Sequence, residues 1–195
     1  MKKIETAIPG VVILEPRVFG DHRGWFSESW NEKTLRDLGI DVRFVQDNES
    51  FSRRGVLRGL HFQKGDAAQA KLVRVLSGEV LDVAIDVRAG SPTFGQHVAV
   101  PLSGENHRQL FIPKGFAHGF VVLSETAHFA YKCDAFYAPA TEGSVNALDP
   151  ELGIDWLVPE EERIFSDKDR TAPSFASYRV DPAFHYEGTS KEDNA

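Results

Sequence analysis

Apolar and polar residues alternate with a period of two along most of this chain, which is the pattern of β-strands that bury one face. The stretch EVLDVAIDVR shows it well, because Leu81, Val83, Ile85 and Val87 alternate with smaller or charged residues. Similar runs, separated by turn residues such as glycine, proline and aspartate, occupy residues 11–19, 25–30, 42–48, 71–76, 97–102, 108–113, 118–123 and 128–133. The pattern predicts about nine or ten short strands.

Helical patterning is sparse. Asn31 can cap a helix N-terminus, Leu35 and Leu38 lie three residues apart, and Gly39 can end the helix, so one short helix is expected there. From Pro139 onward the pattern indicates turns and short helical pieces laid against the strands. An all-β chain of this kind predicts a jelly roll, two facing antiparallel sheets with room for a ligand between them.

Length and composition favour one domain over residues 1–195, with a solvated tail over residues 187–195. The net charge of -7 argues against nucleic acid or an anionic membrane as the main partner, although local arginines can still bind a small anion. Cys133 is the only cysteine, so no disulfide can form within the chain and a reducing cytoplasm is the expected location. The apolar run of residues 11–14 is too short for a signal peptide or a membrane span.

The stretch LRGLHFQ, residues 57–63, places an arginine and a histidine in a strand that its apolar residues predict to be buried. Strict alternation puts Arg58 and His61 on opposite faces, so the two side chains can share a pocket only if the strand is irregular at Gly59. By itself a strand histidine is usually a packed residue with satisfied ring nitrogens, since its proton chemistry needs a partner that sets its tautomer and pKa.

A metal centre is the main alternative use of these histidines. A jelly-roll metal site typically has two histidines one residue apart on a strand, then a carboxylate, and a third histidine on a later strand. His118 could be the later ligand, but Gln63 stands at the second position beside His61. An amide is a poor substitute for imidazole at a transition metal, so we predict no metal and no other cofactor.

Several separated motifs occur in a recognisable order: RGLHFQ, KLVRVLSGEVLDVAIDVR, PTFG, RQLFIPKGFAHGF, YKCDAFYAP, EGSVNALDPELGIDW and SDKD. Together they resemble the dTDP-4-dehydrorhamnose 3,5-epimerase family, a metal-free branch of the cupin jelly rolls, from about residue 4 to residue 173. The resemblance implies an isomerase of dTDP-L-rhamnose biosynthesis that inverts carbons 3 and 5 of dTDP-4-dehydro-6-deoxy-D-glucose.

The resemblance also assigns catalytic roles. His61 is the implied base, Tyr131 the acid on the opposite face, Lys71 the cation near the ketone oxygen, and Asp169 the carboxylate that holds the histidine ring. Each residue type suits its role, because imidazole titrates near neutrality, a phenol can donate a proton and an ammonium offsets enolate charge. Taken singly, Lys71 would be interpreted as a surface residue, Tyr131 as a packed residue and Asp169 as a turn or cap residue.

The implied contacts to the dTDP-sugar combine two arginines for the diphosphate with residues for the nucleotide end and further ligand contacts: Arg23, Phe26, Glu28, Gln46, Asp47, Asn48, Arg58, His118, Glu142 and Lys168. Trp25 and Phe26 could stack on the base, but aromatic residues in a strand favour core packing. Family members typically exchange their N-terminal strands, which implies a homodimer in which Arg23 and Glu28 complete the neighbour's site.

Three alternatives remain open at this point. Relatives in antibiotic sugar pathways invert only carbon 3 or only carbon 5 while they keep the same base and acid. A metal-dependent cupin isomerase or oxygenase is a second alternative, and a catalytically silent sugar-nucleotide binder is a third. The set of His61, Lys71, Tyr131 and Asp169 disfavours the binder, because binding alone needs no paired base and acid.

Overall fold

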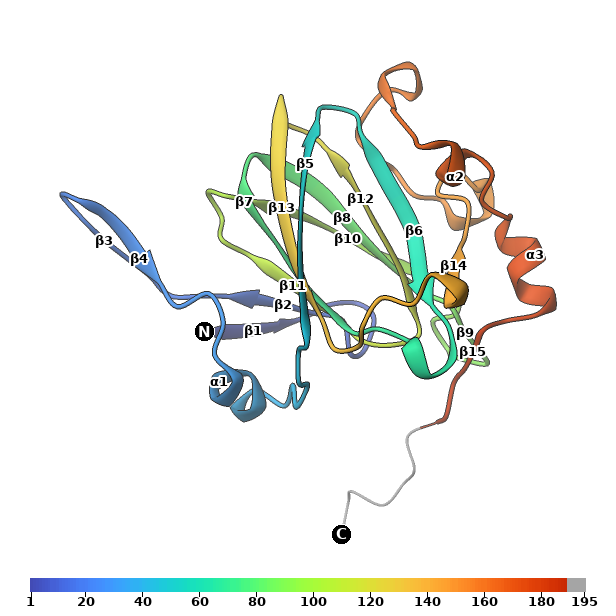
Figure 1. Ribbon diagram of the computed structural model, residues 1–195, viewed down its shortest axis with the longest axis horizontal. Coiled ribbons are helices and arrows are strands. Elements are labelled where there is room, and N and C mark those ends of the chain that lie inside the picture. Colours follow the sequence, from blue (N-terminus) through green and yellow to red (C-terminus); the bar gives the residue numbers. More distant parts are fainter. Residues whose placement is uncertain (189–195) are drawn as a thin grey trace, which may run out of the picture.

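The computed structural model describes residues 1–188 and consists mainly of two facing antiparallel sheets (Figure 1). The six-stranded sheet has the order β1 (Lys2–Glu5), β2 (Val12–Glu15), β11 (Gln109–Ile112), β7 (Lys71–Ser77), β13 (Thr126–Cys133), β5 (Gln46–Arg53). The five-stranded sheet has the order β10 (His97–Ser103), β8 (Glu79–Asp86), β12 (Phe116–Val122), β6 (Leu57–Gln63), β14 (Glu142–Ser144). This arrangement confirms the predicted all-β jelly roll.

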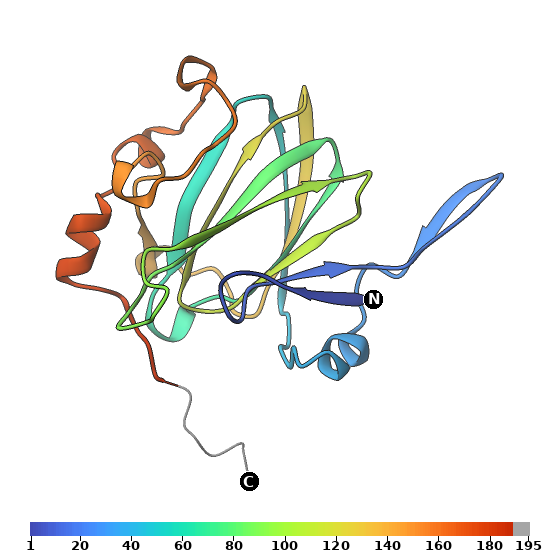
Figure 2. The ribbon, with the colours of Figure 1, turned by 180° about the vertical axis from the view of Figure 1, so that it is seen from behind.

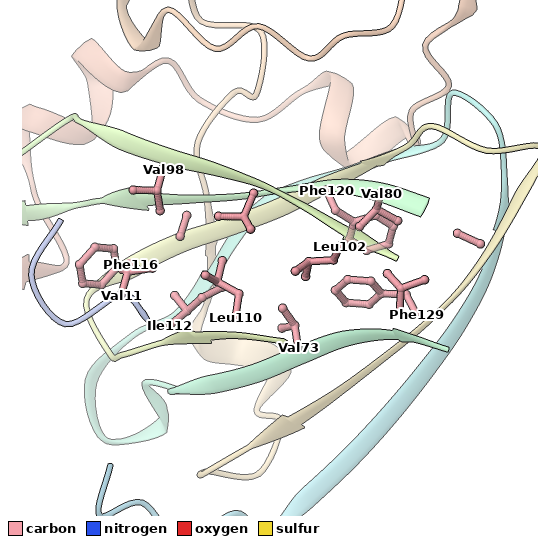
Figure 3. Close-up of a cluster of buried hydrophobic side chains, with 14 of the residues drawn as sticks. Val11, Val73, Val80, Val98, Leu102, Leu110, Ile112, Phe116, Phe120 and Phe129 are labelled. Carbon is pink, nitrogen blue, oxygen red and sulfur yellow. The ribbon is translucent and has the colours of Figure 1, made fainter. Parts of the chain in front are cut away.

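The main core fills the space between the two sheets (Figure 3). Val73, Leu110 and Phe129 point inward from the six-stranded sheet and meet Val80 and Phe120 from the other sheet. All five are at least nine-tenths buried, so the facing sheets are held together by apolar side chains removed from water. The alternation of apolar and polar residues along these strands therefore follows from the packing of their inward side chains between the two sheets.

The ends of the chain cover parts of the outer faces of the sheets (Figures 1 and 2). Helix α1 (Glu32–Asp37) packs Leu35 on the six-stranded sheet, and its Asn31 side chain accepts a hydrogen bond from the Thr34 amide at 3.1 Å, as the sequence predicts. The five-stranded sheet is covered by α2 (Asp167–Arg170), α3 (Phe175–Val180) and the 3-10 turn Pro150–Leu152, and two other 3-10 turns span Pro139–Thr141 and Glu160–Glu162. A further 3-10 turn spans Gly65–Ala67.

Two small strand pairs lie outside the main sheets. The hairpin of β3 (Val18–Asp21) and β4 (Gly24–Ser27) projects away from the body, and β9 (Arg88–Ala89) pairs in parallel with β15 (Phe184–His185) (Figure 1). The predicted tail over residues 187–195 lies mostly outside the described residues. None of the helices within residues 1–188 is long and apolar enough to cross a membrane.

Three details differ from the sequence pattern. Pro16 divides the run of residues 11–19 into two strands, and the run predicted at 42–48 becomes a strand only from Gln46, which then continues to Arg53. Strand β8 was expected to expose one face, but Asp82 and Asp86 are both 0% exposed. Because β8 lies between two neighbours in its sheet and is covered on both faces, its carboxylates find partners inside the protein.

Candidate active site

A cavity of about 360 Å³ lies between the sheets and collects most of the predicted chemistry. One wall comes from β6 and β12, the opposite wall from β5, β7 and β13, and α2 with its preceding residue closes one side. Its lining residues are Glu49, Ser50, Arg58, His61, Lys71, His118, Phe120, Phe129, Tyr131, Ser166 and Asp169. All four predicted catalytic residues, together with Arg58 and His118, therefore meet in one place.

An irregularity at Gly59 brings Arg58 and His61 to the same wall. Across the ladder between β6 and β12, Arg58 pairs with Phe120 and His61 pairs with His118, so two residues of β6 stand opposite one of β12. Gly59 has a φ of 127°, and a Cβ added there would lie 2.5 Å from the Cα of Gly119. Only glycine fits this position, which confirms the predicted condition for a shared pocket.

His61 is held by a buried carboxylate. Its Nε2 lies 2.6 Å from Oδ1 of Asp169, which is 6% exposed, and the Ser166 hydroxyl donates to Oδ2 of the same carboxylate at 2.6 Å. Burial acts to raise the pKa of Asp169, but hydrogen bonds from His61 and Ser166 outweigh it and lower that pKa. The ionised carboxylate can only accept, so Nε2 of His61 carries the hydrogen and Nδ1 carries the lone pair.

Tyr131 and Lys71 belong to the sheet that faces His61. Burial raises the pKa of Tyr131, so its phenol keeps its proton at neutral pH. Burial lowers the pKa of Lys71, and the nearby Cys133, Asp82 and Glu142 act in the opposite direction. Both side chains line the cavity. Lys71 is therefore not a surface residue, and Tyr131 is not only a packed one.

A second histidine–carboxylate pair lies beside the first. Nε2 of His118 lies 3.1 and 2.9 Å from the two carboxylate oxygens of Asp82, and both residues are buried. Burial lowers the pKa of His118, although the Asp82 charge opposes the shift, and its ring stacks on Phe129. Asp82 was missed in the sequence, where it stands on the expected solvent face of a strand; the only available signal was a carboxylate in an otherwise apolar run.

Further polar side chains gather around Glu142 of β14, and Tyr137 links this group to Gln46 at the start of β5. Lys168 and Tyr137 both contact the carboxylate of Glu142, the tyrosine by donating its hydroxyl hydrogen at 3.1 Å, while the Tyr137 amide donates to Gln46 Oε1 at 2.9 Å. Burial acts to raise the pKa of Glu142, but these two partners lower it. The ring of Tyr137 is about half exposed, which makes it a candidate aromatic contact that sequence reasoning did not select.

The two remaining residues of the QDN segment face opposite ways. Asn48 lies on the inward side of β5, where its amide contacts the Cys133 sulfur at 3.8 Å. The carboxylate of Asp47 lies on the exposed side and accepts a hydrogen bond from Lys132 at 2.7 Å. The alternation of a strand therefore separates Asp47 from its neighbours.

Three predicted contacts lie away from this cavity, on or next to the projecting hairpin (Figure 1). Arg23 pairs with Asp21 in solvent, and Glu28 accepts a hydrogen bond from the Asn31 side chain at 3.1 Å. Trp25 and Phe26 are 63% and 69% exposed, so the expectation that they pack in the core is wrong. A two-stranded hairpin that leaves the body has no second layer in this chain to cover its aromatic residues.

Gln63 stands where a metal site would have its second histidine. Its side chain is buried and forms hydrogen bonds with backbone groups. Its carbonyl accepts from the Ala138 amide at 2.8 Å, and its amide lies 3.4 Å from the carbonyl oxygens of Ala67 and Phe136. Within residues 1–188, no group of three or more histidine, cysteine, aspartate or glutamate side chains is arranged to hold a metal ion. Gln63 therefore stabilises the loops around the site.

Comparisons with known proteins match most of this chain to dTDP-sugar epimerases. A family model described as dTDP-4-dehydrorhamnose 3,5-epimerase matches residues 5–177. The dTDP-4-dehydrorhamnose 3,5-epimerase of Salmonella typhimurium is 58% identical over 174 residues, which cover 87% of this chain and 93% of the relative. A dTDP-6-deoxy-D-glucose-3,5-epimerase from Legionella pneumophila, solved in complex with dTDP-4-keto-L-rhamnose, superposes with a TM-score of 0.92 at 52% identity, covering 96% of this chain and 99% of that one.

The same fold also occurs in an enzyme that inverts one carbon. A 3'-monoepimerase from Streptomyces bikiniensis, in complex with dTDP-quinovose, has a TM-score of 0.84 at 38% identity and covers 90% of this chain and 88% of its own. The identity to the 3,5-epimerases is higher, and the family model spans nearly all of the described residues. The chain belongs to the dTDP-4-dehydrorhamnose 3,5-epimerase family.

Proposed function

We propose that this protein inverts carbons 3 and 5 of dTDP-4-dehydro-6-deoxy-D-glucose to give dTDP-4-dehydro-L-rhamnose, a step of dTDP-L-rhamnose biosynthesis. The observation that supports it best is the placement of His61 with Asp169 on one wall of the cavity and Tyr131 with Lys71 on the facing wall. Inversion at a carbon needs a base on one face of the sugar and an acid on the other. The two facing walls of the cavity support such an arrangement.

In the first step Nδ1 of His61 takes the hydrogen from a carbon next to the ketone. The electrons of the C–H bond form an enolate, whose oxygen carries the negative charge. The Lys71 ammonium stabilises that charge, and it does so more strongly in a partly dry cavity than in water. Asp169 stabilises the imidazolium that forms and keeps its ring oriented.

In the second step Tyr131 donates its phenolic proton to the opposite face of the same carbon. The carbon is then inverted, His61 holds the proton it removed and Tyr131 has lost one. Exchange with solvent restores both groups, and the same sequence operates at the other carbon next to the ketone. These acid–base steps need no cofactor, so we propose none.

We propose that Arg58 binds the diphosphate. Within residues 1–188 its guanidinium pairs with no carboxylate, and it lines the cavity beside the reacting groups. A guanidinium presents planar donors that match phosphate oxygens. We assign Gln46, Asp47 and Asn48 to the nucleotide end, and His118, Glu142 and Lys168 to further contacts with the ligand.

We further propose a cytoplasmic homodimer in which the hairpin of one subunit reaches the cavity of the other. The proposal is supported by the exposed aromatic side chains of the hairpin and by its projection from the body (Figure 2). Burying Phe19, Trp25 and Phe26 against a second subunit would remove apolar surface from water. Arg23 and Glu28 would then enter the partner's site.

Subunit mixing tests this exchange. His61→Ala removes the proposed base from the cavity, and Arg23→Ala removes the proposed contact from the hairpin. If the contributions come from different subunits, each mixed dimer contains one intact site, so full exchange of equal amounts restores about a quarter of the wild-type activity. Absence of any recovery in dimers shown to be mixed would place Arg23 in its own subunit's site.

The reaction itself is tested in heavy water. The protein is incubated with dTDP-4-dehydro-6-deoxy-D-glucose, and the sugar is followed by NMR for deuterium at carbons 3 and 5 and for ring configuration. Deuterium at both carbons of an L-configured product is the expected result. Label and inversion at one carbon would identify a mono-epimerase, and no label would refute the proposed function.

A further inference from the structure

Strand β5 carries an inward row of polar residues that continues beyond those already assigned. Gln46, Asn48, Ser50 and Ser52 lie on its partly or fully buried side, and the residues between them are exposed. The strand forms the edge of the six-stranded sheet next to β13, which carries Tyr131. Of this row, Ser50 lines the cavity, and Ser52 contacts Arg58, which also lines it.

Ser52 fixes the guanidinium of Arg58. The serine is 6% exposed, and its hydroxyl oxygen accepts hydrogen bonds from Nε and Nη2 of Arg58, each at 3.2 Å. Nη1 has no protein partner within residues 1–188. One edge of the guanidinium is thus held by the protein, and another edge remains available to a ligand.

Ser50 has a hydroxyl that the protein leaves unused. Its Oγ is buried and has no hydrogen-bond partner, and the residue lines the cavity. Within the described residues only Ser27, which lies on the projecting hairpin, has a similarly unpartnered buried side-chain atom. Buried polar groups are normally hydrogen-bonded, so the Ser50 hydroxyl indicates a partner that binds in the cavity.

The neighbours of Ser50 indicate what that partner is. Ser50 pairs across the ladder with Phe129, whose ring offers no hydrogen bond, and it lies two residues from Ser52 on the same side of the strand. Such positions are about 7 Å apart, which places the hydroxyl near the group that Arg58 binds. A hydroxyl can donate to a phosphate oxygen, and the charge of that oxygen strengthens the bond.

We propose that Ser50 donates a hydrogen bond to the phosphate that carries the sugar, and that Ser52 is a positioning residue that orients Arg58 toward the same diphosphate. This inference rests on the proposed function. It assigns to β5 the binding of the diphosphate as well as of the nucleotide end. The reacting sugar is then placed at a fixed distance from that strand.

Calorimetric titration with dTDP and dTMP tests the role of Ser50, because dTMP lacks the second phosphate. Ser50→Ala should bind dTDP about tenfold more weakly, as expected for one lost hydrogen bond to a charged group, and should bind dTMP as the wild type does. Ser50→Thr keeps the hydroxyl and should restore dTDP binding. Ser177→Ala, which removes a serine hydroxyl from the surface helix α3, is the control and should change neither affinity.

Other outcomes would overturn the inference. Equal dTDP affinity of the wild type and Ser50→Ala would overturn the Ser50 assignment alone. Weaker binding of the dTDP-sugar with unchanged dTDP binding would move the contact to the sugar and overturn the phosphate assignment. No binding of dTDP by the wild type would overturn the proposed function and this inference together.

A double-mutant cycle tests the role of Ser52. Ser52→Ala should raise KM with little change in kcat, because it disturbs the binding of substrate and not the acid or base. If Ser52 acts through Arg58, adding Ser52→Ala to Arg58→Ala should cause no further rise in KM. Additive effects of the two substitutions would show that Ser52 does not act through Arg58.

Discussion

Replacing Asp169 by asparagine tests the geometry of the proposed base. The carboxylate lies 2.6 Å from Nε2 of His61 and is buried, so it fixes which ring nitrogen carries the hydrogen. Ser166 donates to its second oxygen, and an asparagine oxygen can still accept that bond. The asparagine NH₂ group would then face Nε2 and donate to it. The hydrogen of the neutral imidazole would move to Nδ1, the nitrogen that must take the substrate proton.

The expected loss is large, because the ring stays in place with the wrong tautomer. The corresponding change in a serine-protease triad lowers kcat about 10⁴-fold. We expect Asp169→Asn to lower kcat by at least about a thousandfold, equivalent to about 4 kcal/mol of transition-state stabilisation. Binding of dTDP should change little, since the carboxylate contacts His61 and not the diphosphate site.

The assay measures initial rates of epimerisation and dTDP affinity for three proteins. Asp167→Asn is the matched control, because Asp167 lies on the same short helix with an exposed side chain and should behave as the wild type. Circular dichroism establishes that each variant is folded. A kcat above one-tenth of the wild-type value for folded Asp169→Asn would refute the tautomer argument.

Other predictions follow from single contacts. Gly59→Ala should destabilise the fold by at least about 2 kcal/mol in urea unfolding, since its Cβ would meet the backbone of the neighbouring strand at a positive φ; an unchanged midpoint would contradict the bulge. Burial lowers the pKa of Lys71, so the decrease of kcat at alkaline pH should begin below the ordinary lysine pKa of about 10.4. A pH–rate profile of Lys71→Arg should lack this decrease. Asp82→Asn should lower kcat/KM about tenfold to a hundredfold by weakening the hold on His118; wild-type kinetics would show that the pair is only structural. The lowered pKa of Asp169 means that its ionised form adds stability above its ordinary pKa, which is lost as pH falls through the lowered value. Unfolding midpoints should therefore drop more steeply in acid for the wild type than for Asp169→Asn.

Most of the fold could be predicted from the sequence, because strand alternation and helix ends depend on residues close together in the chain. Alternation with a period of two marked most strands, and Asn31 and Gly39 marked the ends of α1. Burial on both faces of β8 could not be read locally, because it depends on which strands lie beside it and what covers the sheet. The prediction that the aromatic residues of the hairpin pack in the core was wrong for the same reason, because the sequence does not show which part of the protein, or which subunit, covers an apolar side chain.

The site was predicted only in part, and the limits are physical. The resemblance of the motifs supplied His61, Lys71, Tyr131 and Asp169, which come from separate strands and a C-terminal helix and meet only after folding. Asp82, which contacts His118, gave only a weak signal, a carboxylate in an otherwise apolar run. An aspartate, serine or tyrosine in a strand has many ordinary uses until its partners are known.

The proposed mechanism requires that the base and the acid lie on opposite sides of the sugar. Hydrogen exchange in heavy water by Tyr131→Phe tests it most directly. In this variant His61 should still remove the proton and return deuterium to the same face, so the substrate is labelled without being inverted, whereas His61→Ala should incorporate no label. Normal inversion by Tyr131→Phe, or wild-type labelling by His61→Ala, would show that the base and the acid are wrongly assigned.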